Sequence, residues 1–201
     1  MYSELAANGQ VELTTTPYYH PIMPLLMMEG WTMEDGIRVN KDAWPEDVQN
    51  HLITGMDLFE DELGFRPTGM WPSEEAVSPA MVQPVTDVGI EWMVTDEEIL
   101  KQSTNQNGDY IDVEDVTNLA TPWKVTGADG GEVAVIFRDR VISDRIAFQY
   151  GTMTPEAAVS DFIAYLDNIR QQLLDAGEDP SEHLLTVALD GENWMFMSEF
   201  Q

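Results

Sequence analysis

Short apolar runs alternate along this chain with segments of helical periodicity. The runs are rich in β-branched and aromatic residues, which is typical of buried strands. Strands that alternate with helices form parallel sheets, and continuously apolar strands indicate that both faces of the sheet are covered. The predicted strands are residues 11–15, a short strand that ends at 70–71, and residues 90–94, 133–137 and 184–189. The pattern therefore predicts an α/β protein.

The predicted helices lie between these runs and are bounded by residues that commonly begin and end helices. Apolar residues recur at helical spacing before Gly64 and before Gly177, and Ser78-Pro79 is a helix start. The predicted helices are residues 2–8, 42–63, 78–89 and 154–177. Residues 102–131 are polar and rich in Gly and Asn, so we expect an excursion there. No repeat or linker interrupts the 201 residues, which favours a single domain.

Polar residues follow the predicted strands at their carboxyl ends. They are His20, Glu74, Asp96, Arg138 with Asp139, and Asp190. The carboxyl ends of barrel strands carry the active sites of α/β barrels. Two carboxylates on two different strands, Glu74 and Asp190, suit acid/base or nucleophilic chemistry on a sugar. Each also has an ordinary alternative, because Glu74 could cap a helix and Asp190 could serve the turn before Gly191.

The excess of acidic residues affects which partners the chain can bind and the salt concentration at which it is stable. There are 37 acidic residues against nine Lys and Arg, a formal net charge of −28, and the excess is spread along the sequence. Nucleic-acid binding is disfavoured, because phosphate requires a basic surface. Molar salt shortens the Debye length to about 3 Å and removes most of the self-repulsion. We predict a halophilic protein whose melting temperature rises steeply between low and molar salt; a flat response would contradict this.

The sequence disfavours disulfides, metal sites, phosphate-binding loops and membrane spans. The chain has no Cys, and its three His residues lack metal-ligand spacing, so no disulfide and no metal site is predicted. No glycine-rich phosphate loop is evident, and no cofactor is predicted. No apolar run has the length of a membrane span, and the N-terminus does not resemble a signal peptide. The predicted location is the cytoplasm.

Five ordered segments of the chain resemble glycoside hydrolase family 57, a family of retaining enzymes that act on α-glucans. Residues 9–13 with 19–22 are similar to the family's second sequence region, and residues 69–78 (GMWPSEEAVS) to its third. Residues 188–193 (ALDGEN) are similar to the fourth region. Residues 92–100 and 137–150 resemble segments of the amylase-like branch.

The resemblance implies a double displacement on starch or maltooligosaccharides. Glu74 would be the nucleophile and Asp190 the general acid/base, with their carboxyl groups about 5–5.5 Å apart. The implied activity is that of an α-amylase, or of a 4-α-glucanotransferase if a sugar hydroxyl replaces water. The implied fold is a seven-stranded (β/α) barrel, followed by helices.

The chain departs from the family pattern in four respects. The family's first region and its C-terminal helical part have no counterpart, and five strands are predicted rather than seven. Trp194 directly follows Asn193, where relatives commonly carry an Ala before the Trp. Residues 1–201 are therefore expected to form an incomplete or reduced (β/α)7 barrel with parallel strands. Its open sheet edge is one that a second copy of the chain could cover.

Two alternatives to an enzyme that acts on α-glucans remain. The chain could be a non-catalytic, glucan-binding fragment of a larger enzyme. A metal-dependent deacetylase also uses a reduced barrel, but its cluster of metal-binding Asp and His residues is not visible in this sequence.

Six residues are candidates for substrate binding: His20, Trp71, Asp96, Arg138, Asp139 and Trp194. The two Trp rings could stack on sugar faces or belong to the core. His20 could contact a sugar hydroxyl or be a structural residue. Asp96, Arg138 and Asp139 could bind hydroxyls, or Arg138 and Asp139 could form a structural Arg–Asp network.

Overall fold

The computed structural model describes residues 1–27, 43–127 and 129–191. These residues fall into two compact units. Unit 1 contains Met1–Thr95 and Trp123–Val135, and unit 2 contains Asp96–Pro122 and the chain from Ile136 onward. The boundary falls inside two strands rather than at a linker, and the expectation of a single catalytic domain stays a prediction. Trp194 lies outside the described residues.

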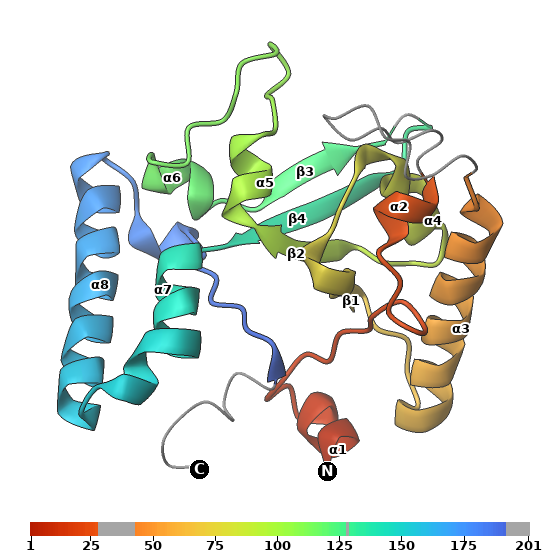
Figure 1. Ribbon diagram of the computed structural model, residues 1–201, viewed down its shortest axis with the longest axis horizontal. Helices are drawn as coiled ribbons and strands as arrows, with labels where there is room; N and C mark the ends of the chain where they lie inside the picture. The colour runs from red at the N-terminus through yellow and green to blue at the C-terminus, as the bar shows by residue number, and fades with distance from the viewer. Residues whose placement is uncertain (28–42, 128, 192–201) are drawn as a thin grey trace. The chain divides into compact units, whose positions relative to one another are not determined.

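A four-stranded sheet organises the described chain (Figure 1). Its strands are β1 (Gly69–Met70), β2 (Trp92–Asp96), β3 (Trp123–Thr126) and β4 (Glu132–Arg138). Their order in the sheet is β1-β2-β4-β3, with β1 parallel to β2 and β3 antiparallel to β4. In Figure 1 the arrows of β2 and β4 point the same way. The α/β class is therefore confirmed, with a mixed sheet.

The antiparallel β3 corrects the expectation that every strand is parallel and that residues 102–131 are an excursion without a strand. Residues 123–126 alternate between half-buried and exposed positions, as one side of a hairpin does. The hairpin closes through the Gly127 N–H, which donates to the Gly131 carbonyl at 2.8 Å. Gly130 has a φ of 88°, which only glycine adopts at low cost.

Two predicted strands, residues 11–15 and 184–189, are wrong as strands. Each contributes one bridge, Thr15 to Met70 and Thr186 to Arg138, both parallel. Residues 11 and 12 are exposed, so their β-branched pattern has no buried face to satisfy. In residues 184–188 the backbone N–H groups of Leu184 and Ala188 donate to a loop carbonyl and to a side chain rather than to a ladder.

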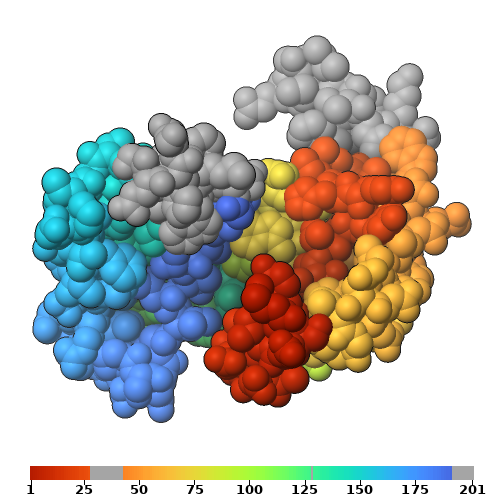
Figure 2. Space-filling view, turned by 90° about the horizontal axis from the view of Figure 1, so that it is seen from below, coloured from red at the N-terminus to blue at the C-terminus, as the bar shows by residue number. Residues whose placement is uncertain are grey.

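Three helices of unit 1, at residues 2–7, 45–63 and 82–87, follow the predicted pattern, whereas the helix at residues 23–27 is not predicted. The helices of unit 1 are α1 (Tyr2–Ala7), α2 (Met23–Met27), α3 (Pro45–Leu63) and α4 (Val82–Asp87), the last preceded by a 3-10 turn at Pro79–Met81. Helix α3 buries Val48, Leu52 and Met56 and ends at Gly64, whose φ is 86°. Helix α3 and the segment that precedes α2 lie side by side on the face seen in Figure 2.

The helices of unit 2 are α5 (Glu97–Lys101), α6 (Val116–Leu119), α7 (Arg140–Asp144) and α8 (Pro155–Asp175). Helix α8 begins where the Thr154 side chain accepts a hydrogen bond from the Ala157 N–H. It buries Ile169 and Leu173 against Val116, and Leu185 packs on the same cluster. Leu185 therefore places the start of the segment that leads to Asp190 against α8, and in Figure 1 this segment then runs away from α8. Among the described residues, no helix combines the length and apolarity needed to cross a membrane.

Candidate active site

A single parallel bridge aligns the two segments that lead to His20 and Glu74. The Thr15 N–H donates to the Gly69 carbonyl at 3.1 Å, and the Trp71 N–H donates to the Thr15 carbonyl at 2.8 Å. His20 follows Thr15 by five residues, and Glu74 follows Met70 by four. The register of this bridge therefore brings both side chains to the carboxyl end of β1.

The backbone is strained on both sides of this meeting point. Four non-glycine residues of the described chain have positive φ: Tyr19 (62°), His20 (54°), Glu74 (56°) and Glu75 (55°). Such conformations cost about 1–3 kcal/mol each and persist only where the surroundings impose them. The buried Thr95 hydroxyl donates to the Glu75 carbonyl at 2.6 Å and so holds the turn that presents Glu74.

His20 bridges Glu74 to a threonine. Its Nε2 lies 3.3 Å from Glu74 Oε1, and its Nδ1 lies 3.0 Å from Thr16 Oγ1. A carboxylate only accepts hydrogen bonds, so Nε2 of a neutral imidazole carries the proton and Nδ1 accepts from Thr16. The side chains of His20 and Glu74 are 45% and 69% exposed, which leaves both within reach of a ligand.

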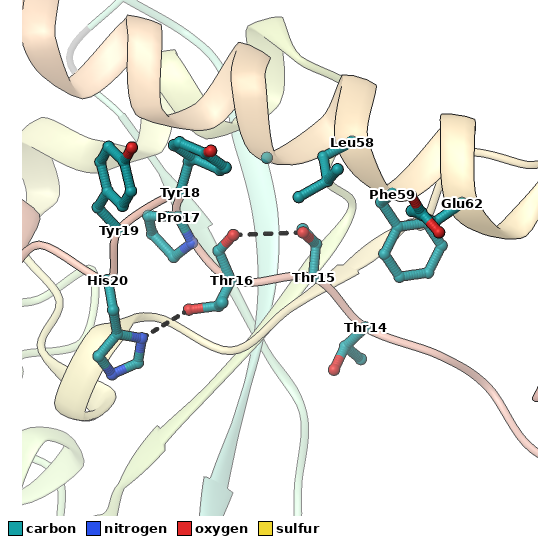
Figure 3. Close-up of a pocket in the computed structure, with 11 residues that line it drawn as sticks. Thr14, Thr15, Thr16, Pro17, Tyr18, Tyr19, His20, Leu58, Phe59 and Glu62 are labelled. Atoms are coloured by element: carbon teal, nitrogen blue, oxygen red, sulfur yellow. Dashed lines mark hydrogen bonds between the residues drawn. The ribbon is translucent and has the colours of Figure 1, made fainter.

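Close packing against α3 fixes the backbone that carries Thr16 and His20. The Tyr18 N–H donates to the His51 carbonyl of α3 at 3.0 Å. A Cβ at Gly55 would lie 2.9 Å from the Thr16 carbonyl oxygen, so glycine is required for this approach. A groove of about 440 Å³ lies between the segment and α3 (Figure 3). In Figure 3, Leu58, Phe59 and Glu62 come from α3, and His20 points away from that helix.

Arg138 organises the second half of the predicted site, in unit 2. Its Nε donates to Asp96 Oδ2 at 2.8 Å, its Nη2 lies 3.8 Å from Asp144 Oδ1, and its Nη1 donates to the Ala188 carbonyl at 3.4 Å. The Arg138 and Asp96 side chains are only 19% and 17% exposed. Arg138 thus connects the end of β2 to the segment that carries the exposed Asp190.

Asp139 supports the elements around it. It is buried, its Oδ1 accepts from the Ile142 N–H at 3.1 Å, and its Oδ2 accepts from the Tyr165 hydroxyl at 2.6 Å. Burial, followed by the hydrogen bond to Asp139, raises the pKa of Tyr165. This arrangement favours a structural role for Asp139 over the predicted contact with substrate.

Glu97 lies beside Asp139 at the start of α5. Its half-buried position raises the pKa of its carboxyl group, and the charges of Asp139 and Asp96 act in the same direction. The carboxylate accepts a hydrogen bond from the Arg140 N–H at 3.1 Å. Glu97, Asp139 and Tyr165 line a cavity of about 190 Å³ against α8.

Sequence reasoning missed two hydroxyls that contact the predicted site. Thr16 holds His20, and Ser143 Oγ accepts from the Ala188 N–H at 3.2 Å. A threonine in a loop and a serine on a short helix carry no signal of their own in one sequence.

Trp71, another of the predicted site residues, is half-buried directly after β1. Glu74 and Asp190 belong to different units, so their predicted separation of about 5–5.5 Å stays a prediction. In the part of the chain that the structure describes, no cluster of three metal-ligating side chains occurs.

The family of this chain is identified by matching its sequence to models of protein families. The sequence model of glycosyl hydrolase family 57 matches residues 1–201. The chain belongs to glycosyl hydrolase family 57. The resemblance found in the sequence segments is therefore confirmed.

Relatives of the chain within glycosyl hydrolase family 57 include two enzymes with distinct names. An alpha-amylase of Pyrococcus abyssi is 22% identical over 90% of this chain and 21% of its own length. A 4-alpha-glucanotransferase of Thermococcus litoralis is 21% identical over 89% of this chain and 21% of its own length. The chain therefore spans about a fifth of these relatives.

Solved structures of family 57 enzymes share the fold. A branching enzyme of Thermococcus kodakaraensis has a TM-score of 0.71 at 14% identity, over 99% of this chain and 44% of that one. An alpha-amylase of Thermotoga maritima has a TM-score of 0.67 at 14% identity, over 99% of this chain and 46% of that one. The described sheet is thus part of the larger family fold, and the reduced barrel is confirmed only as a partial α/β domain.

Proposed function

We propose that this chain carries the catalytic pair of a retaining enzyme that cleaves α-glucans, with Glu74 as nucleophile and Asp190 as general acid/base. The observation that supports it most is the placement of Glu74. It lies in a strained turn four residues after β1, its side chain is exposed, and its Oε1 lies 3.3 Å from His20 Nε2. A carboxylate that caps a helix needs neither the left-handed backbone nor the imidazole.

The reaction proceeds in two displacements. A Glu74 oxygen attacks the anomeric carbon, the bond to the leaving glycosidic oxygen breaks, and Asp190 gives that oxygen a proton. The product is a glycosyl ester on Glu74. Asp190 then takes a proton from water as the water attacks the same carbon, and the ester bond to Glu74 breaks. A sugar hydroxyl in place of water gives a longer glucan, so hydrolysis and transfer use the same residues.

The other predicted contacts fit around this pair. His20 Nε2–H donates to Glu74 in the resting site and so orients the carboxylate of the proposed nucleophile. Trp71 directly follows β1 and precedes Glu74, so its ring is proposed to stack on a sugar face. Binding of substrate hydroxyls by Asp96 and stacking of Trp194 on a sugar face stay predictions.

The alternative is a glucan-binding fragment without turnover, which is favoured by the share of the relatives that the chain spans. Activity on maltooligosaccharides in molar KCl, with Glu74→Gln as control, separates the two. Turnover by the native chain and none by the variant is the result expected. Equal rates, or no turnover by either protein, would contradict the proposal. Longer products would identify transfer, and shorter products alone would identify hydrolysis.

A further inference from the structure

Both backbone polar groups of Ala188 are bound by side chains of unit 2. Its N–H donates to Ser143 Oγ at 3.2 Å, and its carbonyl accepts from Arg138 Nη1 at 3.4 Å. Ala188 lies two residues before Asp190. We propose that Ser143 and Arg138 are positioning residues that fix the place of the Asp190 carboxyl group. The inference rests on the proposed function, because it gives Asp190 the role of general acid.

The segment around Asp190 needs such support because regular structure supplies little of it. Before Asp190, the described segment joins the sheet through one bridge, from Thr186 to Arg138. The Asp139 N–H donates to the Thr186 carbonyl at 2.8 Å, and the next backbone contacts of the described segment are the two at Ala188. A shift of Ala188 is therefore passed on to Asp190 across one intervening residue.

The two side chains that bind Ala188 are themselves held in place. Ser143 is fully buried on α7, and its N–H donates to the Asp139 carbonyl at 3.1 Å. Arg138 is held by Asp96 at 2.8 Å and by Asp144 at 3.8 Å. The Arg138 donor and the Ser143 acceptor bind the two peptide groups that flank the Ala188 Cα, so they fix the position of this residue as well as its orientation.

The consequence is a defect that depends on the leaving group. A general acid must lie within about 2.6–3.2 Å of the oxygen that it protonates. A displacement of about 1 Å can cost a factor of about 100 in rate. Fluoride leaves without protonation, whereas a sugar alcohol does not. A misplaced Asp190 therefore slows cleavage of a maltooligosaccharide and spares cleavage of a maltosyl fluoride.

The test compares Ser143→Ala with Ser160→Ala, the same substitution at an exposed site on α8, in molar KCl. We expect Ser143→Ala to lower kcat/KM on maltohexaose about 10-fold, a change of about 1.4 kcal/mol, and to leave kcat/KM on α-maltosyl fluoride unchanged. Hydrogen exchange of the Ala188 amide should be at least about 10-fold faster in Ser143→Ala, since an amide without its acceptor is open to solvent.

Asp190→Asn is the reference that keeps the two proposals apart. If Asp190→Asn affects both substrates equally, the proposed acid role fails, whatever Ser143→Ala does. If Asp190→Asn spares only the fluoride and Ser143→Ala behaves like Ser160→Ala, the positioning role is overturned. Unchanged exchange at Ala188 would overturn the contact itself, independently of any activity.

Discussion

The two halves of the proposed site are supported in different ways. Glu74 is held mainly by backbone, through a parallel bridge from Thr15 to Met70 and a strained turn, with the buried Thr95 hydroxyl as one added side-chain contact. Asp190 is held mainly through side chains, since Arg138 and Ser143 bind the backbone of Ala188. A backbone ladder tolerates changes of side chain, whereas a side-chain contact is lost with one substitution. The Asp190 half should therefore be the more sensitive to mutation outside the catalytic residues.

The largest effect is expected at Arg138. Arg138→Met removes the donor to Ala188 and leaves Asp96 and Asp144 without this cation, so kcat/KM on maltohexaose should fall by about 100-fold. Arg140→Met is the matched control, because Arg140 is half-exposed and pairs with Asp144 at 3.6 Å. Far-UV circular dichroism checks that both variants are folded. Equal activities of the two folded variants would show that Arg138 does not support the site.

A smaller loss is expected on the Glu74 half. Thr16→Val removes the hydroxyl that binds His20 Nδ1 without changing side-chain size, and kcat/KM should fall about 10-fold. Thr16→Ser should restore the rate, and Thr14→Val, at an exposed position of the same segment, should leave it unchanged. The ¹⁵N resonance of Nδ1 should move toward that of an unbonded imidazole nitrogen in Thr16→Val. An unchanged resonance would place Thr16 outside the contact.

The bridge that aligns Glu74 depends on close packing at β1. A Cβ at Gly69 would lie 2.4 Å from the Trp92 ring, whose Nε1–H also donates to Glu12 at 2.8 Å. Gly69→Ala should therefore lower the free energy of unfolding by about 1–3 kcal/mol. Gly191→Ala, where a Cβ would meet nothing within 4 Å, is the control for urea denaturation. Equal midpoints would contradict the tight approach.

Much of the fold follows from the sequence, and the exceptions have physical reasons. Helices α3 and α8 have long apolar stripes and clear stops, so their limits are predicted within a few residues. The short apolar runs before Glu74 and Asp190 are both predicted as strands, but residues 184–189 of the described chain pair with β4 through a single bridge only. Strand β3 is signalled only by four alternating residues before a glycine turn.

The residues of the candidate site likewise fall into those that the sequence predicts and those that it does not. Motif residues such as Glu74, His20 and Asp96 lie at the ends of predicted strands or soon after them, and are found by their position. Ser143 contacts Ala188, 45 residues away, and Thr16 contacts His20 within one loop; neither contact is revealed by spacing in one sequence. The sequence alone does not distinguish an Arg138 that binds a sugar from an Arg138 that binds a backbone carbonyl.

The smallest effect concerns stability in unit 2. Burial raises the pKa of Glu97, so its neutral form favours folding at low pH, and this contribution is lost as the pH rises through the pKa of the folded state. Glu97→Gln keeps an oxygen that can accept from the Arg140 N–H. The variant should match the native chain in urea midpoint near pH 4 and exceed it at about pH 7. Parallel pH curves would contradict a raised pKa.

Whether Glu74 forms a covalent bond to the sugar is tested most directly by trapping. A 5-fluoro-α-glucosyl fluoride reacts fast through its fluoride leaving group and then hydrolyses slowly, so a glycosyl ester accumulates on a retaining enzyme. Peptide mass spectrometry after reaction in molar KCl should find one added fluoroglucosyl group, on the peptide that contains Glu74, and none in Glu74→Gln. A label on another carboxylate, or turnover of maltohexaose without any labelled peptide, would contradict the account.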